Sequence, residues 1–266
     1  MGLMRSGFGV AMAALLAAGC TPAANDAPVA AAPQAAAAPV AAPPASRRAA
    51  TARRPAPPAA TALAAPGAAG WVVDAATGCW LWIHLAPPGV AGSWTGACPR
   101  GPVEGPGEAR FAWTQDGAPR TASVTGHFRH GRIEGEGTAV APDGRRYAGT
   151  FRDGRGNGRG RVTFPNGNTY EGDIVDDRFQ GRGVLGFPNG DRYEGDLVNN
   201  LATGRGIYTW GNGDRYEGGI RDNRPDGQGS YRTAARRYEG TWNYGCFRDP
   251  LDGARVAMWR PLSECP

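Results

Sequence analysis

The sequence predicts an all-β fold: an elongated single-layer antiparallel sheet of consecutive β-hairpins, preceded by a disordered Ala/Pro-rich segment. Three observations predict it, namely a marker that returns every 23 residues, turn dipeptides inside each repeat, and side chains that alternate with the period of a strand. The composition agrees. Of the 266 residues, 42 are glycine without the three-residue period of collagen, and 8 each of Trp, Tyr and Phe exclude a wholly disordered chain.

Three marks in fixed register carry the 23-residue period. A Tyr-x-Gly triplet returns at Tyr147, Tyr170, Tyr193, Tyr216 and, one residue early, Tyr238. A Gly-x-Gly pair precedes each triplet, beginning at Gly135, Gly158, Gly181, Gly204 and Gly227. Between the two marks lies Asp-Gly or Asn-Gly in the first four copies, at 143–144, 166–167, 189–190 and 212–213. The registered marks establish a repeat array, which we place at residues 135–248.

The copy around Tyr193 shows how each repeat forms a hairpin. Pro-Asn-Gly at 188–190 is typical of a three-residue loop. This loop sets Leu185 opposite Tyr193 and Gly183 opposite Gly195. Because side chains alternate across a strand, glycines, aromatic and aliphatic side chains share one face and charged side chains the other. We expect each tyrosine ring to cover the bare glycines of adjacent strands.

Weaker copies extend upstream of the array. In the array, nine residues separate the glycine of one triplet from the next Gly-x-Gly, and the same step separates Gly126 from Gly135 and Gly96 from Gly105. The copy beginning at Gly105 contains an insertion of seven residues near Trp113. Residues 71–134 are therefore expected to form an N-terminal β cap with degenerate repeats.

The repeat resembles that of a known family. Gly-Arg-Gly-Ile-Tyr-Thr-Trp-Gly-Asn-Gly-Asp-Arg-Tyr-Glu-Gly at 204–218 is similar to the MORN repeat, and the resemblance covers 135–248 well and 94–134 loosely. The resemblance implies an elongated single-layer sheet and a non-catalytic role in interaction, dimerisation or scaffolding. Phospholipid binding has been proposed for some members of the family. We therefore expect neither enzyme activity nor a cofactor.

The first residues predict export. Residues 1–19 carry one positive charge, Arg5, and a short apolar run, which is typical of a signal peptide. The ending Leu-Ala-Ala-Gly-Cys resembles a bacterial lipoprotein signal, in which Cys20 is lipidated. Ala17 stands where the pattern prefers Leu, and an ordinary cleaved signal is the alternative. Thr21 follows the cysteine, and in that sorting scheme a residue other than Asp implies an outer-membrane lipoprotein facing the periplasm. Without lipidation the protein is expected to be secreted.

Residues 20–70 predict a disordered linker. Positions 21–70 contain 24 Ala and 10 Pro. Proline breaks helices, and alanine offers too little apolar surface for a core. The segment is either a tether from the membrane or simple low complexity.

The net charge of +5 belongs to the same region. Residues 1–70 hold five Arg against one Asp, which leaves +1 for the remaining 196 residues. A basic stripe for nucleic acid is therefore not expected in the sheet. There is no Lys in the chain, which excludes Schiff-base chemistry and a Walker lysine.

Four cysteines flank the array. Export predicts an oxidising compartment, so we expect two local disulfides, Cys79–Cys98 and Cys246–Cys265, that hold the end caps. Four cysteines allow three connectivities, and a zinc site that includes His84 is the alternative. Residues 249–266 are assigned to a C-terminal cap.

A single-layer sheet cannot bury its aromatic face alone, so we expect a cap, a second copy or a ligand to cover it. The candidate binding face consists of Tyr147, Phe164, Tyr170, Phe187, Tyr193, Tyr208, Trp210, Tyr216 and Tyr238. The expected occupant is an envelope protein or a second copy of the chain. The alternatives are a face that only stabilises the sheet and direct binding of phospholipid or envelope glycan.

No catalytic or metal-binding residue is nominated. The glutamates Glu171, Glu194, Glu217 and Glu239 form a column, but a catalytic residue is normally unique and not repeated. An envelope enzyme, with a site in 71–134, is the remote alternative.

Overall fold

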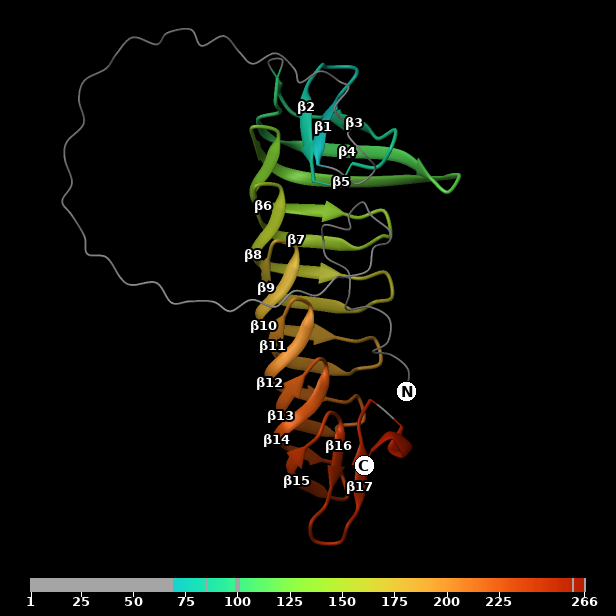
Figure 1. Cartoon of the computed structure of the whole chain (residues 1–266). Coiled ribbons are helices and arrows are strands. Elements are labelled where there is room, and N and C mark those ends of the chain that lie inside the picture. The colour runs from blue at the N-terminus through green and yellow to red at the C-terminus, as the bar shows by residue number, and fades with distance from the viewer. Residues whose placement is uncertain (1–68, 85, 99–100, 260, 266) are drawn as a thin grey trace, which may run out of the picture.

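The computed structural model describes residues 69–84, 86–98, 101–259 and 261–265. The expected signal peptide, Cys20 and the linker up to residue 68 lie outside the described residues. The described chain forms one long ladder of antiparallel strands with a small two-stranded sheet at each end (Figure 1). None of the described residues forms a helix long and apolar enough to cross a membrane.

The central sheet of the described chain has thirteen strands, β3 to β15, each paired with its neighbours in sequence. The strands are β1 (Gly70–Val73), β2 (Trp80–Ile83), β3 (Ala91–Trp94), β4 (Gly105–Gln115), β5 (Ala118–Arg129), β6 (Arg132–Val140), β7 (Arg146–Arg152), β8 (Arg155–Thr163), β9 (Thr169–Val175), β10 (Arg178–Gly186), β11 (Arg192–Val198), β12 (Leu201–Thr209), β13 (Arg215–Arg221), β14 (Arg224–Arg232), β15 (Arg237–Trp242), β16 (Cys246–Arg248) and β17 (Arg255–Ala257). A 3-10 turn at Leu262–Glu264 follows. The predicted fold class, an elongated single-layer antiparallel sheet of hairpins, is confirmed.

Each repeat forms the predicted hairpin around a three-residue loop. In β10 and β11, Leu185 pairs with Tyr193, which is the register predicted from the sequence. Across the loop, the Phe187 N–H donates to the Asp191 carbonyl at 3.0 Å. Gly190 closes the loop with φ 86°, in the left-handed region that favours glycine. The loop therefore sets the register of the whole repeat.

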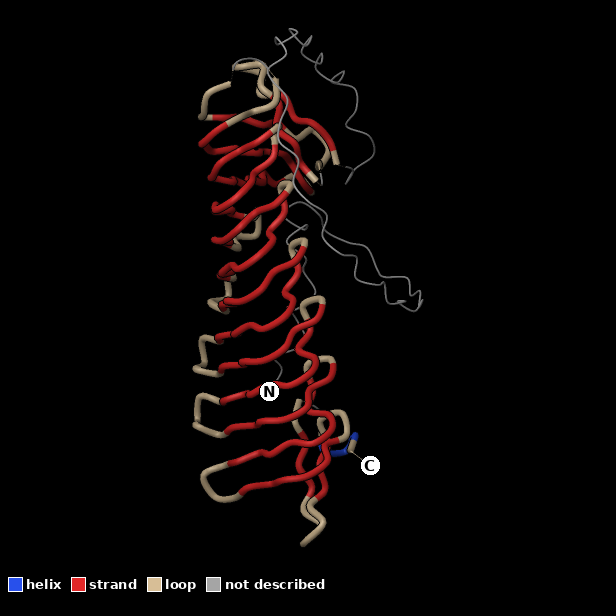
Figure 2. Tube along the Cα trace, turned by 90° about the vertical axis from the view of Figure 1, so that its left-hand side faces the viewer, coloured by secondary structure: helices blue, strands red, loops and turns tan. Residues whose placement is uncertain are grey.

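Two-residue turns, not predicted from the sequence, join successive hairpins. Both turn residues have a left-handed backbone, with φ 47° and 66° at Asp176 and Asp177, and 50° and 71° at Asn199 and Asn200. This is type I′ geometry, whose twist matches the flanking strands and which Asp and Asn tolerate well. The odd loop and the even turn alternate along the ladder, so strands of one repeat continue directly into the next (Figure 2).

An irregularity bends every second strand of the array. In β10, three residues lie between Phe179 and Gly183, while their partners in β9, Ile174 and Gly172, enclose only one. Gly181 lies at this point with φ 66°. The same two extra residues occur in β8, β12 and β14. The first residues of each such strand therefore fold over the aromatic face.

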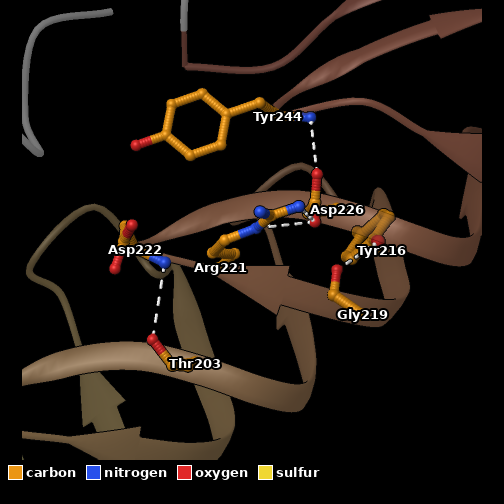
Figure 3. Close-up of polar contacts among 7 residues, drawn as sticks. All are labelled: Thr203, Tyr216, Gly219, Arg221, Asp222, Asp226 and Tyr244. Atoms are coloured by element: carbon orange, nitrogen blue, oxygen red, sulfur yellow. Dashed lines mark hydrogen bonds and ion pairs between the residues drawn. The ribbon is translucent and has the colours of Figure 1, made fainter. Parts of the chain in front are cut away.

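The bent strands lie over the tyrosine column, which consists of Tyr147, Tyr170, Tyr193 and Tyr216. A Cβ on Gly183 would lie 2.5 Å from the ring of Tyr170, so the ring lies directly on bare backbone. On the other side Phe179 stacks on the ring, with centroids 3.6 Å apart. The Tyr170 hydroxyl donates to the Asp173 carbonyl at 2.6 Å. The same bond, to the carbonyl three residues on, is made by Tyr147, Tyr193 and Tyr216, the last drawn in Figure 3.

The N-terminal cap continues this packing without the tyrosines. Trp94 lies over Gly107, where a Cβ would clash with the indole ring, and Gly126 pairs with Gly137 as in the repeats. The inserted residues lengthen β4 and β5 into a hairpin that extends beyond the others (Figure 1). The β1–β2 hairpin packs against β3 through a bridge between Asp74 and Gly92.

The two expected disulfides, Cys79–Cys98 and Cys246–Cys265, are both present, one in each cap. Each closes a local segment of 19 residues. The zinc alternative is wrong for the described residues, because all four cysteines are consumed in disulfides. His84 instead places its Nε2 2.7 Å from the Asp153 carbonyl.

Candidate functional site

The nine residues of the predicted binding face fall into two groups. Five side chains are buried within the chain, each at most 4% exposed: Tyr147, Tyr170, Tyr193, Tyr208 and Tyr216. The bent strands cover the tyrosine column, contrary to the expectation that only a cap, a second copy or a ligand could do so, whereas Tyr208 is in contact with Trp259 of the predicted C-terminal cap. Phe164, Phe187, Trp210 and Tyr238 are only partly buried.

Three of these partly buried rings form a row, which we call the aromatic strip: Phe164, Phe187 and Trp210. Each is the last residue before a three-residue loop, at the same position of consecutive repeats. Successive rings lie on every second strand, so neighbouring rings are two strand spacings, or about 9.6 Å, apart. Tyr238 lies beyond the strip and is covered by Arg236, whose guanidinium is 4.9 Å from the ring centroid.

The C-terminal tail covers one end of the aromatic strip. Trp259 stacks on Trp210, with centroids 5.9 Å apart and planes at 23°, and its ring also meets Tyr208 at 5.1 Å. Trp259 has φ 58°, an uncommon conformation for a bulky residue. The sequence predicts residues 249–266 as a C-terminal cap but not this contact with the repeat of Tyr208 and Trp210, because the 23-residue period does not extend to Trp259.

The opposite face of the sheet is polar. Arg192, Arg215 and Arg237 each form an ion pair with the glutamate two residues on, at 2.6, 2.7 and 3.1 Å. The glutamate column is thus part of an exposed ladder of ion pairs, each worth less than about 1 kcal/mol. Such pairs explain why charge recurs once per repeat.

The last repeats depart from this balance. Arg215 lies opposite Arg232, which in turn lies opposite Arg237, and like charges at such positions destabilise a sheet. Among the described residues, Arg232 has no ion-pair partner. With Arg205 these side chains line a shallow depression of about 570 Å³ that also contains Glu217 and Glu239.

The two-residue turns fasten each repeat to the one before it. Asp177 accepts from the Gly156 N–H at 2.7 Å, while its own N–H donates to the Gly156 carbonyl at 3.0 Å. Asn200 and Asn223 make the same pair of bonds one and two repeats later. At the end of the array, Asp226 accepts from Arg221 and from the Tyr244 N–H, which ties β14 to the turn between β15 and β16 (Figure 3).

Asp177 is the one charged member of this series and is 6% exposed. Burial raises its pKa to about 6, against a lowering by the Gly156 N–H and by Arg155 and a further raising by Asp176. Because the pKa of Asp177 in the folded protein lies above its unfolded value of 3.8, the contribution of this carboxyl group to the free energy of unfolding is greatest below pH 4. That contribution is lost as the pH rises through 6.

We therefore expect Asp177→Asn to stabilise the protein at pH 7.5, on the order of 2 kcal/mol, because an amide makes the same bond without a buried charge. Below pH 4 the difference between the two proteins is expected to vanish. Urea unfolding of both proteins from pH 4 to 8 measures it. A difference that does not change with pH would show that Asp177 is not the titrating group, and Asp176→Asn, at the exposed first turn position, is the control.

Among the described residues, no three His, Cys, Asp or Glu side chains are arranged to hold a metal ion. Comparison with protein families finds the MORN repeat at residues 125–145, 147–169, 170–192, 193–215 and 216–234. No curated protein matches the chain. MORN repeats are in general non-enzymatic modules for interaction with proteins or membranes. The five matched repeats coincide with the hairpins of β6 to β14, so residues 125–234 of this chain are a series of MORN repeats.

Proposed function

We propose that this protein is an exported, lipid-anchored interaction module of the bacterial cell envelope that binds a protein partner, or a second copy of itself, through the aromatic strip. The observation that carries the proposal is the exposure of Phe164 and Phe187. The β1–β2 hairpin covers the N-terminal end of the aromatic face, and Trp259 covers Trp210. Two partly exposed phenyl rings thus lie between two capped ends, and exposed apolar groups of this kind are typical of interaction surfaces.

The location is proposed from the sequence. Lipidated Cys20 would hold the chain at the periplasmic side of the outer membrane, and residues 21–70 would separate the array from the bilayer by on the order of 100 Å when extended. We expect Cys20→Ser to move the protein from the outer-membrane fraction to the soluble fraction and to abolish labelling by a fatty-acid probe. Unchanged fractionation would contradict the anchor, and Thr21→Ser, which keeps the cysteine, is the matched control.

The partner surface is tested by the pair Phe164→Ser and Phe187→Ser in one chain. Both rings are partly exposed, so we expect a modest loss of stability and a loss of chemical crosslinks to envelope proteins. Val175→Ser with Val198→Ser is the matched control, because these valines are 47% and 43% exposed at the two-residue turns, away from the strip. Equal crosslinking of all three proteins would contradict the proposal.

A second candidate function is binding of an anionic envelope ligand, a phospholipid headgroup or a charged glycan, to the polar face. The three arginines on adjacent strands beside the 570 Å³ depression favour it, because an anion would relieve their mutual repulsion. We expect the Cys20→Ser chain to float with anionic vesicles at low salt, and Arg232→Ser to weaken this binding. No flotation, together with no sedimentation on cell-wall material, would exclude this candidate.

A further inference from the structure

We propose that a proline-rich stretch of this chain, Arg53–Pro58, binds the uncovered part of the aromatic strip as a polyproline II helix, so that the linker is held on the array in place of hanging free. The inference uses the strip of the proposed function, and an external partner would have to compete with the linker. It names an occupant from within the chain and thus adds a means of regulating access.

The periods of the two elements match. One ring of the aromatic strip follows another every two strands, at about 9.6 Å. A polyproline II helix advances about 9.3 Å in its three-residue turn. Residues three apart in such a helix therefore meet successive rings of the strip. Pro55 and Pro58 are spaced in this way within Arg-Arg-Pro-Ala-Pro-Pro, and proline-rich helices bind grooves lined by aromatic side chains.

The strip already accepts one segment of the chain. The C-terminal tail lies across Trp210 through Trp259, with Pro261 two residues later. Within the part of the chain that the structure describes, Phe164 and Phe187 have no comparable cover. The uncovered part of the aromatic strip therefore consists of two rings, Phe164 and Phe187. Two prolines, Pro55 and Pro58, have the spacing that matches them.

The linker is long enough to reach the uncovered part of the aromatic strip. Gly70, where β1 begins, lies twelve residue steps after Pro58, and these steps span about 37 Å as a polyproline II helix. From β3, against which β1 packs, the Phe164 ring is five strands away, or about 24 Å, and the Phe187 ring is seven strands away, or about 34 Å. Both rings therefore lie within the range of the segment.

The charges are complementary. Arg53 and Arg54 precede the prolines, and two carboxylates lie beside the loops of the strip. Asp191 accepts from the Tyr208 hydroxyl at 2.7 Å and from the Gly211 N–H at 2.9 Å. Because its donors are uncharged, its negative charge is not neutralised, and the same holds for Asp214, which accepts from the Tyr231 hydroxyl.

Weak contacts suffice in this geometry. A segment joined by a short flexible connection has an effective concentration of about 1 mM, so an intrinsic dissociation constant near 0.1 mM keeps it bound about nine-tenths of the time. Bound linker is cut by a protease only when it detaches. We therefore expect trypsin to cleave after Arg53, within the bound stretch, about tenfold more slowly than in a linker that does not bind.

The experiment measures this cleavage in the full chain under native conditions. Phe164→Ser with Phe187→Ser is expected to raise the rate about tenfold, while the control Val175→Ser with Val198→Ser leaves it unchanged. Pro55→Gly with Pro58→Gly is expected to raise it equally, with Pro33→Gly and Pro39→Gly as the linker control. The linker variants leave the sheet untouched, so a folding defect cannot mimic their effect.

The same cleavage rate in the wild type, the phenylalanine pair and the Pro55/Pro58 pair would overturn the inference. That result would leave the proposed function standing, because crosslinking of the strip to other molecules is measured separately. Conversely, slow cleavage without any crosslink to another molecule would support linker binding and contradict the external partner.

Discussion

Gly195→Ala is expected to lower the free energy of unfolding by about 3 kcal/mol or more, which would make it one of the most damaging single-methyl additions in the array. A Cβ at this position would lie 2.5 Å from the Arg205 carbonyl oxygen and 2.6 Å from both the Gly206 Cα and the Tyr193 hydroxyl. Two of these neighbours are backbone of the paired strand, so β11 and β12 would have to separate. Urea unfolding of the full chain, followed by circular dichroism, measures the loss.

The matched control is Gly227→Ala. Gly227 has φ 87° and open space around its missing side chain, so alanine there meets backbone strain alone, of about 1–2 kcal/mol. If Gly195→Ala proved no more destabilising than Gly227→Ala, the close packing of glycine on glycine would not be what the repeat requires.

The second large effect concerns the caps. Replacing Cys79 and Cys98 together by alanine is expected to cost about 3 kcal/mol, because the disulfide closes a local segment and the unfolded chain gains its freedom. Cys79 is fully buried, and end repeats have no further neighbour to cover them. Replacing Cys246 and Cys265 is expected to have a similar effect at the other end.

Thermal melting with and without a reductant distinguishes the outcomes. We expect reductant to destabilise the wild type most, each double variant about half as much, and the variant without all four cysteines hardly at all. Melting of the wild type that does not respond to a reductant under unfolding conditions would contradict a stabilising role for the disulfides.

The local rules of the repeat were sufficient to predict its register. Pro-Asn-Gly permits one loop geometry, and that loop places Leu185 opposite Tyr193 and glycine opposite glycine, as observed. The same reasoning identified Gly96 as part of a degenerate repeat, and the structure places the ring of Trp94, two residues earlier, over Gly107, where the array has tyrosine. These features depend on neighbours in sequence, which periodicity reveals directly.

The burial of the tyrosines could not be predicted in the same way. It depends on the two extra residues at Gly181 and its equivalents, and on which side of the sheet the bent strand then lies. The paired Asp and Asn residues at 176–177, 199–200 and 222–223 were an available sign of two-residue turns, since these residues tolerate left-handed backbone. A sequence analysis that does not recognise these turns leaves the aromatic face uncovered. It therefore assigns five buried tyrosines to an exposed binding surface.

What the structure changes for function is the size of the surface. A partner does not meet nine aromatic side chains but mainly Phe164 and Phe187, on a row whose far end is taken by Trp259. Such a short row favours a slender ligand, such as an extended peptide, over a broad flat surface. This applies equally to a segment of another protein and to the chain's own proline-rich stretch.

The central claim is that the aromatic strip contacts another molecule in the cell envelope. It is tested most directly by a photo-crosslinking amino acid placed at Phe187 in the full chain, in living cells, with the same group at Val198 on the turn edge as control. We predict adducts of defined mass at position 187, to a protein, to a second copy of the chain or both, and none of these at position 198. Irradiation that yields no adduct at position 187, or the same adducts at both positions, would contradict the account.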